Sequence, residues 1–267
     1  MIDIHHHLLF GLDDGSPDVE TSVAMVEAAA ADGITHIVCT PHANARFPFQ
    51  PEVNREKLET LRARMNDMVT LGLGCDFRLS FDNVEDALKN RTKYTINQKQ
   101  YLLVEFDDIF IPQKMTEMFY ELRAAGQRPI ITHPERNATM QRQPERMKDW
   151  LREGTLVQVT ASSLTGRFGR TAQSLAERFL DKNWVHVLAT DAHNTESRPP
   201  KLSEAYGIVA KRYGEDTAQR LCVTNPRAVF LGEELGEQPP PLDIEDEEAA
   251  AQKQKKGLLG WLFSSFL

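Results

Sequence analysis

Apolar runs rich in β-branched residues alternate along the chain with stretches of helical periodicity. Seven runs predict strands, at residues 1–4, 35–40, 75–79, 101–105, 129–132, 156–160 and 185–190. Helical spacing separates most of them, at residues 55–68, 116–125, 144–152, 171–183 and 201–213. A further helix is expected to begin at Ser16 as its cap and Pro17 in its first turn, and to end at Gly33. Strands that alternate with helices predict an α/β fold with a parallel, barrel-like sheet.

Histidines and acids follow directly after several of the apolar runs. His42 follows Thr40-Pro41, Glu105 ends one run, and His133 and Asp191 each come directly after another. In parallel barrels the carboxyl ends of the strands meet at one face, where functional residues gather. We therefore expect these side chains to converge.

The chain begins with a strand that carries three consecutive histidines. Side chains alternate along a strand, so His5 and His7 point to one side, and His6 points away into packing or solvent. Asp191-Ala192-His193 repeats the two-residue spacing near the other end of the barrel sequence. One zinc or iron ion needs only three or four protein ligands, so a larger donor set favours several metals and hydrolytic phosphate chemistry. The candidate donors are His5, His7, Asp14, His42, Asp76, Glu105, His133, Asp191 and His193.

Composition narrows the function classes. The 267 residues carry a net charge of −8 and no basic stripe, which argues against a nucleic-acid groove. Three widely spaced cysteines predict reduced thiols of a cytoplasmic protein, and none begins the C-x5-R loop of cysteine-dependent phosphatases. No signal peptide is evident, and no apolar run approaches the ~20 residues of a membrane span.

The sequence changes character after about residue 231. Residues 232–256 contain three consecutive prolines, an acidic run and a basic run, and predict a flexible, exposed linker. Residues 257–267 form a short apolar tail with Trp261, Leu262, Phe263 and Phe266. The tail is expected to dock onto its own domain or a partner subunit, or to contact a membrane surface with help from nearby lysines.

The order of motifs resembles a known superfamily. The motifs are H-x-H, D-D-G, T-P-H, L-V-E-F, T-H-P-E-R and T-D-A-H-N followed by S-R-P-P. They are similar to the PHP (polymerase and histidinol phosphatase) superfamily and, within it, to the bacterial tyrosine phosphatases of capsular and exopolysaccharide loci. The resemblance covers about residues 1–231.

The resemblance implies a distorted (β/α)7 barrel with three divalent metal ions. Manganese is the expected metal, with iron, zinc or magnesium as alternatives, and the nine donors above would be the ligands. Arg136 and Arg198 match the family's phosphate-binding arginines, and His42 or a metal-bound water would supply a proton. The family also makes Asp14 the ligand, with Asp13 in support of the site or as a helix cap. For Arg136, the alternative role is a salt bridge with Glu135 or Glu145.

Asp76 departs from the family pattern, because relatives usually carry glutamate as a bridging ligand there. The shorter side chain requires a backbone shift or leaves one metal more loosely held, and Asp82 is the alternative ligand. Phe47, Pro48 and Phe49 form either a rim for an aromatic substrate or ordinary packing.

Three functions follow from this resemblance. The first is a protein-tyrosine phosphatase that acts on a membrane-associated tyrosine kinase of polysaccharide export. The second is a small-molecule phosphatase of the histidinol-phosphate type. The third is an inactive accessory domain, which is disfavoured because no ligand position is missing.

Overall fold

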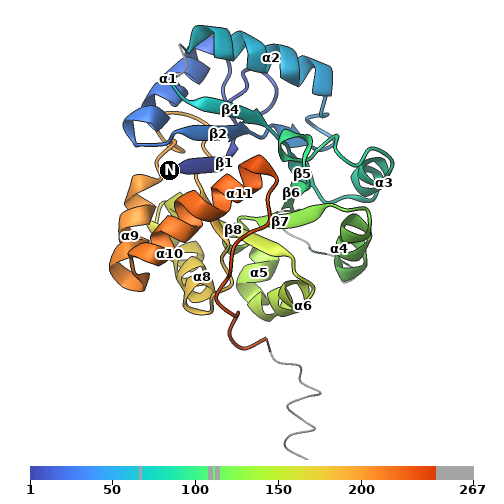
Figure 1. The fold of residues 1–267 in the computed structure, drawn as a ribbon, viewed down its shortest axis with the longest axis vertical. Coiled ribbons are helices and arrows are strands. Elements are labelled where there is room, and N and C mark those ends of the chain that lie inside the picture. The colour runs from blue at the N-terminus through green and yellow to red at the C-terminus, as the bar shows by residue number, and fades with distance from the viewer. Residues whose placement is uncertain (66–67, 108–110, 112–114, 245–267) are drawn as a thin grey trace, which may run out of the picture.

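Nine short strands, all paired in parallel, form the centre of the molecule (Figure 1). The structure, a computed structural model, describes residues 1–65, 68–107, 111 and 115–244. The strands are β1 (Ile2–His6), β2 (His36–Cys39), β3 (His42–Ala43), β4 (Thr70–Leu73), β5 (Asp76–Arg78), β6 (Tyr101–Glu105), β7 (Arg128–Thr132), β8 (Leu156–Thr160) and β9 (Val187–Ala189). They form two sheets, ordered β1-β2-β4 and β3-β5-β6-β7-β8-β9.

The nine strands occupy seven positions around a barrel. β2 pairs with β4 and β3 pairs with β5, so β2–β3 and β4–β5 are two long strands, each interrupted once. Pro41 lies in the first interruption, where its missing N–H removes a ladder hydrogen bond. The sheets join again at a parallel bridge between His6 and Ala192, where the His7 N–H donates to the Ala192 carbonyl at 2.9 Å. The predicted distorted (β/α)7 barrel is confirmed.

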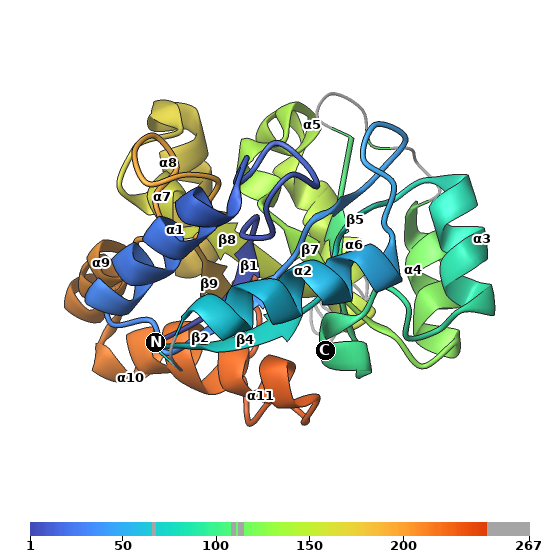
Figure 2. The same ribbon diagram turned by 90° about the horizontal axis from the view of Figure 1, so that it is seen from above.

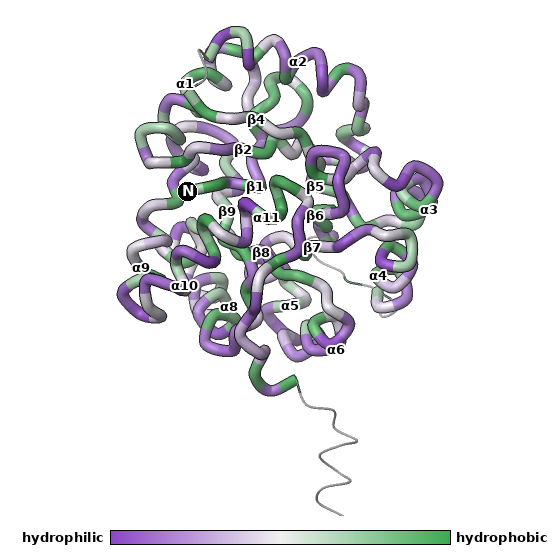
Figure 3. The backbone as a smooth tube through the Cα atoms, in the orientation of Figure 1, coloured by the Kyte–Doolittle hydropathy of each residue, from purple (hydrophilic) through white to green (hydrophobic). Residues whose placement is uncertain are grey.

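Helices surround the strands. The main ones are α1 (Val19–Ala31), α2 (Pro51–Arg64), α3 (Phe81–Lys89), α4 (Met115–Ala124), α6 (Met147–Arg152), α8 (Gly169–Asp181) and α9 (Ser203–Tyr213). The shorter segments are η1 (Ile96–Gln98), η2 (Pro134–Arg136), α5 (Ala138–Arg142), η3 (Pro144–Arg146), α7 (Ala161–Leu164), α10 (Glu215–Gln219), η4 (Arg220–Thr224) and α11 (Asn225–Leu231). Helices α3 and α8 carry both hydrophilic and hydrophobic stretches (Figure 3), as expected of helices with one face on a barrel.

The start of the first helix differs from the prediction. α1 begins at Val19, and the carboxylate of Asp18 caps it by accepting the Thr21 N–H at 2.8 Å. The Ser16 hydroxyl instead donates to the Asp18 carbonyl at 2.8 Å, so Ser16 supports the turn before the helix and is not its cap. Asp18 is a stronger cap because its carboxylate is charged and lies at the positive end of the helix dipole.

Alternation along the strands fills the barrel with an apolar layer and then a polar one. Ile2, Leu103, Ile130 and Ala189 belong to one buried cluster inside the barrel. The residue two positions after Leu103 is Glu105, the one two positions after Ile130 is Thr132, and the one two positions after Ala189 is Asp191. The barrel interior therefore changes from apolar to polar toward the carboxyl ends of its strands.

Helix α11 and the segment after it cover the amino-terminal end of the barrel (Figure 2). The Tyr101 hydroxyl donates to the Glu233 carbonyl at 2.6 Å, and the Trp184 indole N–H donates to the Leu242 carbonyl at 2.9 Å. The predicted boundary between barrel and linker stays a prediction. Residues 245–267, which include the apolar tail, lie outside the described residues. Among the helices that are described, none combines the length and apolar character needed to cross a bilayer.

Candidate active site

The nine predicted donors meet at the carboxyl end of the barrel. Their ligand atoms fall into four groups, each within 4.8 Å, and every one of the nine belongs to at least one group. The groups are His7-Asp14-His42-His193, His5-His7-Asp76, His5-His133-Asp191 and His42-Asp76-Glu105. Shared members such as His5 and Asp76 link the groups into one cluster. Whether each residue acts as a metal ligand remains a prediction.

A register shift in β1 brings His5 into the cluster. Ile2 and Ile4 already face the barrel interior, so regular alternation would point His5 outward. The pairing of β1 with β2 is irregular between Asp3 and His6, and this irregularity lets His5 face inward as well. His5 Nε2 then lies 3.4 Å from Asp191 Oδ1 and 3.6 Å from Asp76 Oδ2.

The cluster crosses the seam where the last strand meets the first. His7 Nε2 lies 3.3 Å from Asp191 Oδ1, although the two residues are far apart in sequence. The buried carboxylate of Asp3 accepts the Thr190 N–H at 3.0 Å and so ties β1 to the end of β9. His6 belongs to none of the four donor groups and is fully buried, so it packs inside the protein and does not face solvent.

Several buried atoms of the cluster have no hydrogen-bond partner among the described residues. They are His42 Nδ1, Asp76 Oδ2 and Glu105 Oε2. His42 Nδ1 lies 3.2 Å from Asp76 Oδ2 and 3.7 Å from Glu105 Oε2, so the three face one another. An unsatisfied buried polar atom is costly, and a cation between these atoms would satisfy all three. Mixed imidazole and carboxylate donors suit divalent manganese, iron and zinc.

Electrostatic effects within the cluster shift its pKa values in both directions. Burial favours the neutral form of His5, but the carboxylates of Asp191 and Asp76 outweigh it and raise its pKa to about 9. Burial, with repulsion from Asp76, raises the pKa of Glu105 to about 7. Burial and the Arg136 guanidinium hold the pKa of His133 well below its usual value. Cations that bind here would therefore compete with protons.

Two of the candidate ligands have unusual backbone conformations. His133 has φ 34° and Asp191 has φ 52°, a left-handed region that residues other than glycine rarely adopt. Each comes at the end of a strand, where the conformation turns the side chain into the cluster. Such strain costs about 1–3 kcal/mol per residue and is concentrated at functional sites.

Residues behind the cluster orient its histidines. Gln158 Oε1 lies 2.9 Å from His5 Nδ1, and Asp13 Oδ2 lies 2.7 Å from His7 Nδ1. Asp13 also accepts the Gly15 N–H at 2.9 Å, so of its two predicted roles it supports the site and does not cap a helix. A Cβ on Gly15 would lie 2.2 Å from the His7 carbonyl oxygen, and only glycine fits there. Partners of this kind fix ring orientation in metal sites.

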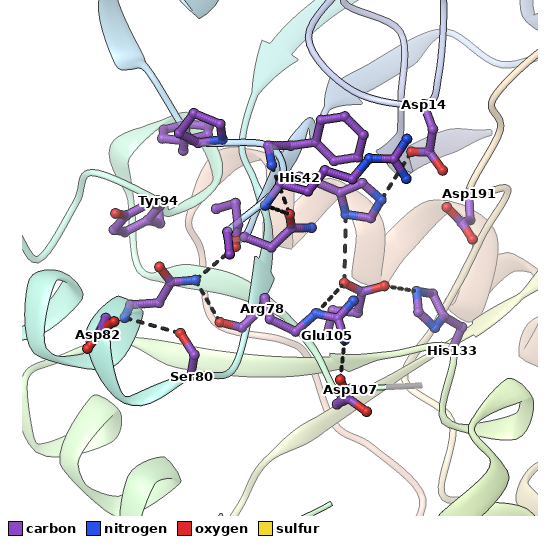
Figure 4. A pocket seen from close by; sticks show the side chains of 18 of the residues that line it. Asp14, His42, Arg78, Ser80, Asp82, Tyr94, Glu105, Asp107, His133 and Asp191 are labelled. Atoms are coloured by element: carbon purple, nitrogen blue, oxygen red, sulfur yellow. Dashed lines mark hydrogen bonds and ion pairs between the residues drawn. The ribbon is translucent and has the colours of Figure 1, made fainter. Parts of the chain in front are cut away.

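Asp76 and Asp82, the two alternatives for the shorter acidic ligand, lie in different parts of the structure. Asp76 is fully buried and belongs to two of the four donor groups. Asp82 is exposed, belongs to none of them, and lines a more distant part of the cleft (Figure 4). Arg78 lies between these regions, with Nε 3.2 Å from Glu105 Oε2.

The two predicted phosphate-binding arginines lie side by side. Arg136 and Arg198 both donate to Asp191 Oδ2. The guanidinium of Arg136 lies 4.3 Å from the centre of the Phe168 ring, and that of Arg198 lies 5.9 Å from it. Phe168 therefore supports both cations. The acids weighed as salt-bridge partners of Arg136 are engaged elsewhere: Glu135 accepts the Ser163 hydroxyl at 2.7 Å, and Glu145 pairs with Lys148 at 2.6 Å.

Three supporting residues were missed in the sequence. Gln158 lies within a strand and Phe168 in a loop between helices, and neither belongs to a recognisable motif. The third, Asn194, accepts the N–H groups of Glu196, Ser197 and Arg198 at 2.8–3.0 Å and so shapes the turn that carries Arg198. Of the three, only Asn194 could have been found from the sequence, because it directly follows His193 in the T-D-A-H-N motif.

A cleft of about 940 Å³ opens over the cluster (Figure 4). Its lining includes both arginines and residues 42–49, among which the ring of Phe47 stacks on His42 with centroids 5.9 Å apart. The cleft therefore joins candidate metal ligands, two cations and an aromatic wall.

A family model described as "Capsular polysaccharide synthesis, CpsB/CapC" matches residues 1–231. The chain belongs to the CpsB/CapC family. It is 33% identical to CapC of Staphylococcus aureus over 93% of this chain and 98% of that protein. It is 32% identical to the tyrosine-protein phosphatase YwqE of Bacillus subtilis (strain 168), over 90% of this chain and 95% of that one.

Solved structures agree with this assignment. One chain from the crystal structures of YwqE from Bacillus subtilis and CpsB from Streptococcus pneumoniae, described as unique metal-dependent tyrosine phosphatases, superposes with a TM-score of 0.85. It is 31% identical, and the match covers 91% of this chain and all of that one. The lactonase Lmo2620 from Listeria monocytogenes shares the fold, with a TM-score of 0.56 at 11% identity.

Proposed function

We propose that this CpsB/CapC family member is a metal-dependent protein-tyrosine phosphatase. One observation carries the proposal: nine metal-type donors and two arginines converge beneath a single cleft. Relatives that cover most of this chain are named tyrosine-protein phosphatases, and the matched structures are described as metal-dependent.

The donor set supports more than one metal ion. We infer three divalent ions, with manganese first and iron, zinc or magnesium as alternatives, held by His5, His7, Asp14, His42, Asp76, Glu105, His133, Asp191 and His193. When bound, such ions supply Lewis-acid activation of water and neutralise phosphoryl charge.

The chain's own residues would orient the phosphoryl group. Arg136 and Arg198 would bind its oxygens, because guanidinium groups match phosphate geometry, and Phe168 would hold both groups in place. His42, only partly buried at the cleft floor, would pass a proton only while no metal ion holds its ring; otherwise a metal-bound water would supply the proton. A tyrosine phenolate has a conjugate-acid pKa of ~10 and leaves more readily than a serine alkoxide, so it needs little acid assistance.

The dimensions of the cleft favour a protein substrate over a small molecule of the histidinol-phosphate type. Its volume of about 940 Å³ lies near the upper end of ligand pockets, and part of it lies well away from the donor cluster. We infer that the substrate is a phosphotyrosine protein, with a membrane-associated tyrosine kinase of capsule or exopolysaccharide synthesis as the expected partner.

A substrate comparison with controlled metal content tests the proposal. Protein purified without added metal should contain divalent metal by elemental analysis, and it should hydrolyse a phosphotyrosyl peptide far faster than histidinol phosphate. A chelator should abolish turnover, and manganese should restore it. Faster turnover of histidinol phosphate would replace the proposal with its alternative, and full activity in chelator would remove the metal requirement.

The apolar tail needs a separate test. The expected membrane or subunit contact through Trp261, Leu262, Phe263 and Phe266 falls outside the described residues and stays a prediction. Flotation with anionic vesicles should recover the full chain but not a chain truncated after Pro241. Equal flotation of both forms would rule out the membrane contact.

A further inference from the structure

The cleft continues past the donor cluster into a second region, which we call the outer arm. It is lined by residues 44–49, Ser80, Asp82, Asn83, Asp86, Lys93 and Tyr94. Figure 4 shows Tyr94, Ser80 and Asp82 across the pocket from Asp191 and His133. None of the four donor groups includes an outer-arm residue. The proposed chemistry therefore leaves this part of the cleft unused.

The outer arm has a rigid aromatic floor. The ring of Tyr94 packs against Phe49 and Phe77, with centroids 5.3 and 5.0 Å away. The Tyr94 hydroxyl donates to Asp86 Oδ2 at 2.6 Å, and Lys93 Nζ lies 2.7 Å from the same oxygen. The floor is thus fixed before any ligand binds, and its charges are already paired.

One wall of the outer arm is the beginning of α3. The Asn83 side chain donates to the Ala43 and Arg78 carbonyls at 2.8 and 2.9 Å and so fixes the helix against two strands. Beside it, Phe81 is 76% exposed and Asp82 is also exposed. Of these two residues only Asp82 lines the cleft, so the wall presents a carboxylate on a rigid element.

A second wall, formed by residues 44–49, carries a cation. Arg46 is exposed and lies over the Phe47 ring at 4.8 Å. Across the part of the chain that the structure describes, neither Arg46 nor Asp82 has an ion-pair partner, whereas Arg78 and Lys93 both do. The outer arm thus has one available charge of each sign, Arg46 on the segment 44–49 and Asp82 at the beginning of α3.

We propose that the outer arm binds the polypeptide beside the phosphotyrosine and that Arg46 and Asp82 select the charge of its side chains. The inference rests on the proposed function. When the phosphate of a phosphotyrosine lies at the donor cluster, the backbone of that residue lies at the open part of the cleft. A chain that runs along the outer arm meets the aromatic floor and both unpaired charges. An aryl phosphate without a peptide would leave these contacts empty.

Charge-reversal variants at the two walls test the proposal with metal-loaded, full-length protein. The substrates are two phosphotyrosyl peptides that differ only in flanking lysines or flanking glutamates, and p-nitrophenyl phosphate. The quantity compared is the ratio of kcat/KM for the glutamate peptide to that for the lysine peptide. Because both peptides meet the same reaction centre, this ratio cancels any effect on the chemistry.

Asp82→Lys should raise the ratio about fivefold and Arg46→Glu should lower it about fivefold, both mainly through KM and less at high salt. Tyr120→Ala, at an aromatic residue that is 64% exposed on α4 outside the cleft, should leave the ratio unchanged. Ratios equal to that of the unmodified chain in both charge variants would overturn the outer-arm proposal. Failure of the unmodified chain to hydrolyse any of the three substrates would overturn the proposed function itself.

Discussion

The two ends of the barrel differ in whether their polar groups are hydrogen-bonded. At the carboxyl end, buried atoms of His42, Asp76 and Glu105 face one another without hydrogen bonds. At the amino end, Tyr101 donates to the Glu233 carbonyl, and Asn225 exchanges hydrogen bonds of 2.9–3.0 Å with Gln238. The first arrangement leaves buried donor atoms that a bound cation can satisfy, and the second closes the fold. Changes at one end should therefore alter chemistry, and changes at the other should alter stability.

The largest effect is expected from Arg136→Ala at the carboxyl end. Loss of a guanidinium that binds the phosphoryl group should lower kcat/KM for a phosphotyrosyl peptide about 100-fold or more. Metal content and melting temperature should stay near those of the unmodified chain. Arg142→Ala, at an exposed arginine of α5, is the matched control. Unchanged phosphatase activity in Arg136→Ala would remove this residue from the site.

Gly15→Ala tests the support behind the donor cluster. The added methyl would lie 2.5 Å from the Cβ of His7 and would push this histidine out of place. Metal affinity should fall about 10- to 100-fold, measured by metal titration. Gly207→Ala is the control, because nothing lies within 4 Å of the new methyl in α9 and alanine favours a helix. Equal metal affinity in the two variants would show that this close approach is unimportant.

Asn225→Ala addresses the opposite end. The Asn225 side chain donates to the His186 carbonyl at 2.8 Å and contacts Gln238, so its removal leaves partly buried polar groups unpaired. The free energy of unfolding should fall by about 2 kcal/mol in urea titrations. The kcat of the folded enzyme should not change. A large loss of kcat without loss of stability would contradict the division between the two ends.

The pH dependence of stability offers a second test at the amino end. His186 Nδ1 accepts the Val157 N–H at 3.2 Å, and burial lowers the pKa of His186 to about 4. The unfolded chain therefore takes up this proton first, so stability is full above pH ~6.5 and declines as the pH falls toward 4. His186→Gln should reduce the loss between pH 7 and 5 by about 1–2 kcal/mol. Identical slopes for both proteins would show that His186 is not responsible.

The smallest effect is expected at the aromatic support of the two arginines. Phe168→Leu keeps apolar volume but removes the ring, and kcat/KM should fall about fivefold with weaker inhibition by inorganic phosphate. Phe168→Tyr keeps the ring and should restore both values. Metal content should be the same in all three proteins. If the leucine and tyrosine variants behave alike, Phe168 has only a packing role.

The sequence predicted the convergence of the strand-end residues well, because in this fold the metal-type side chains directly follow strands. His42, Glu105, His133 and Asp191 each follow a strand, and in a parallel barrel such residues must meet. β4 was missed because Gly72 interrupts a four-residue strand that has little pattern of its own. Simple alternation predicts that His5 faces the cluster. In the structure His5 does so because of a register shift in β1.

The supporting residues were harder to predict for a different reason. Phe168 contacts Arg136 and Arg198 only through the tertiary arrangement of two loops. Gln158 looks like any polar residue within a strand until the barrel places it beside His5. Local patterns carry no record of such contacts between distant segments.

The seam between β1 and β9 bears on how the protein is made in the cell. His5 and His7 are synthesised nearly two hundred residues before Asp191 and His193, which lie beside them in the folded protein. A nascent chain thus lacks the complete donor cluster during most of translation. A metal site that spans this seam can therefore be completed only after Asp191 and His193 have folded against β1.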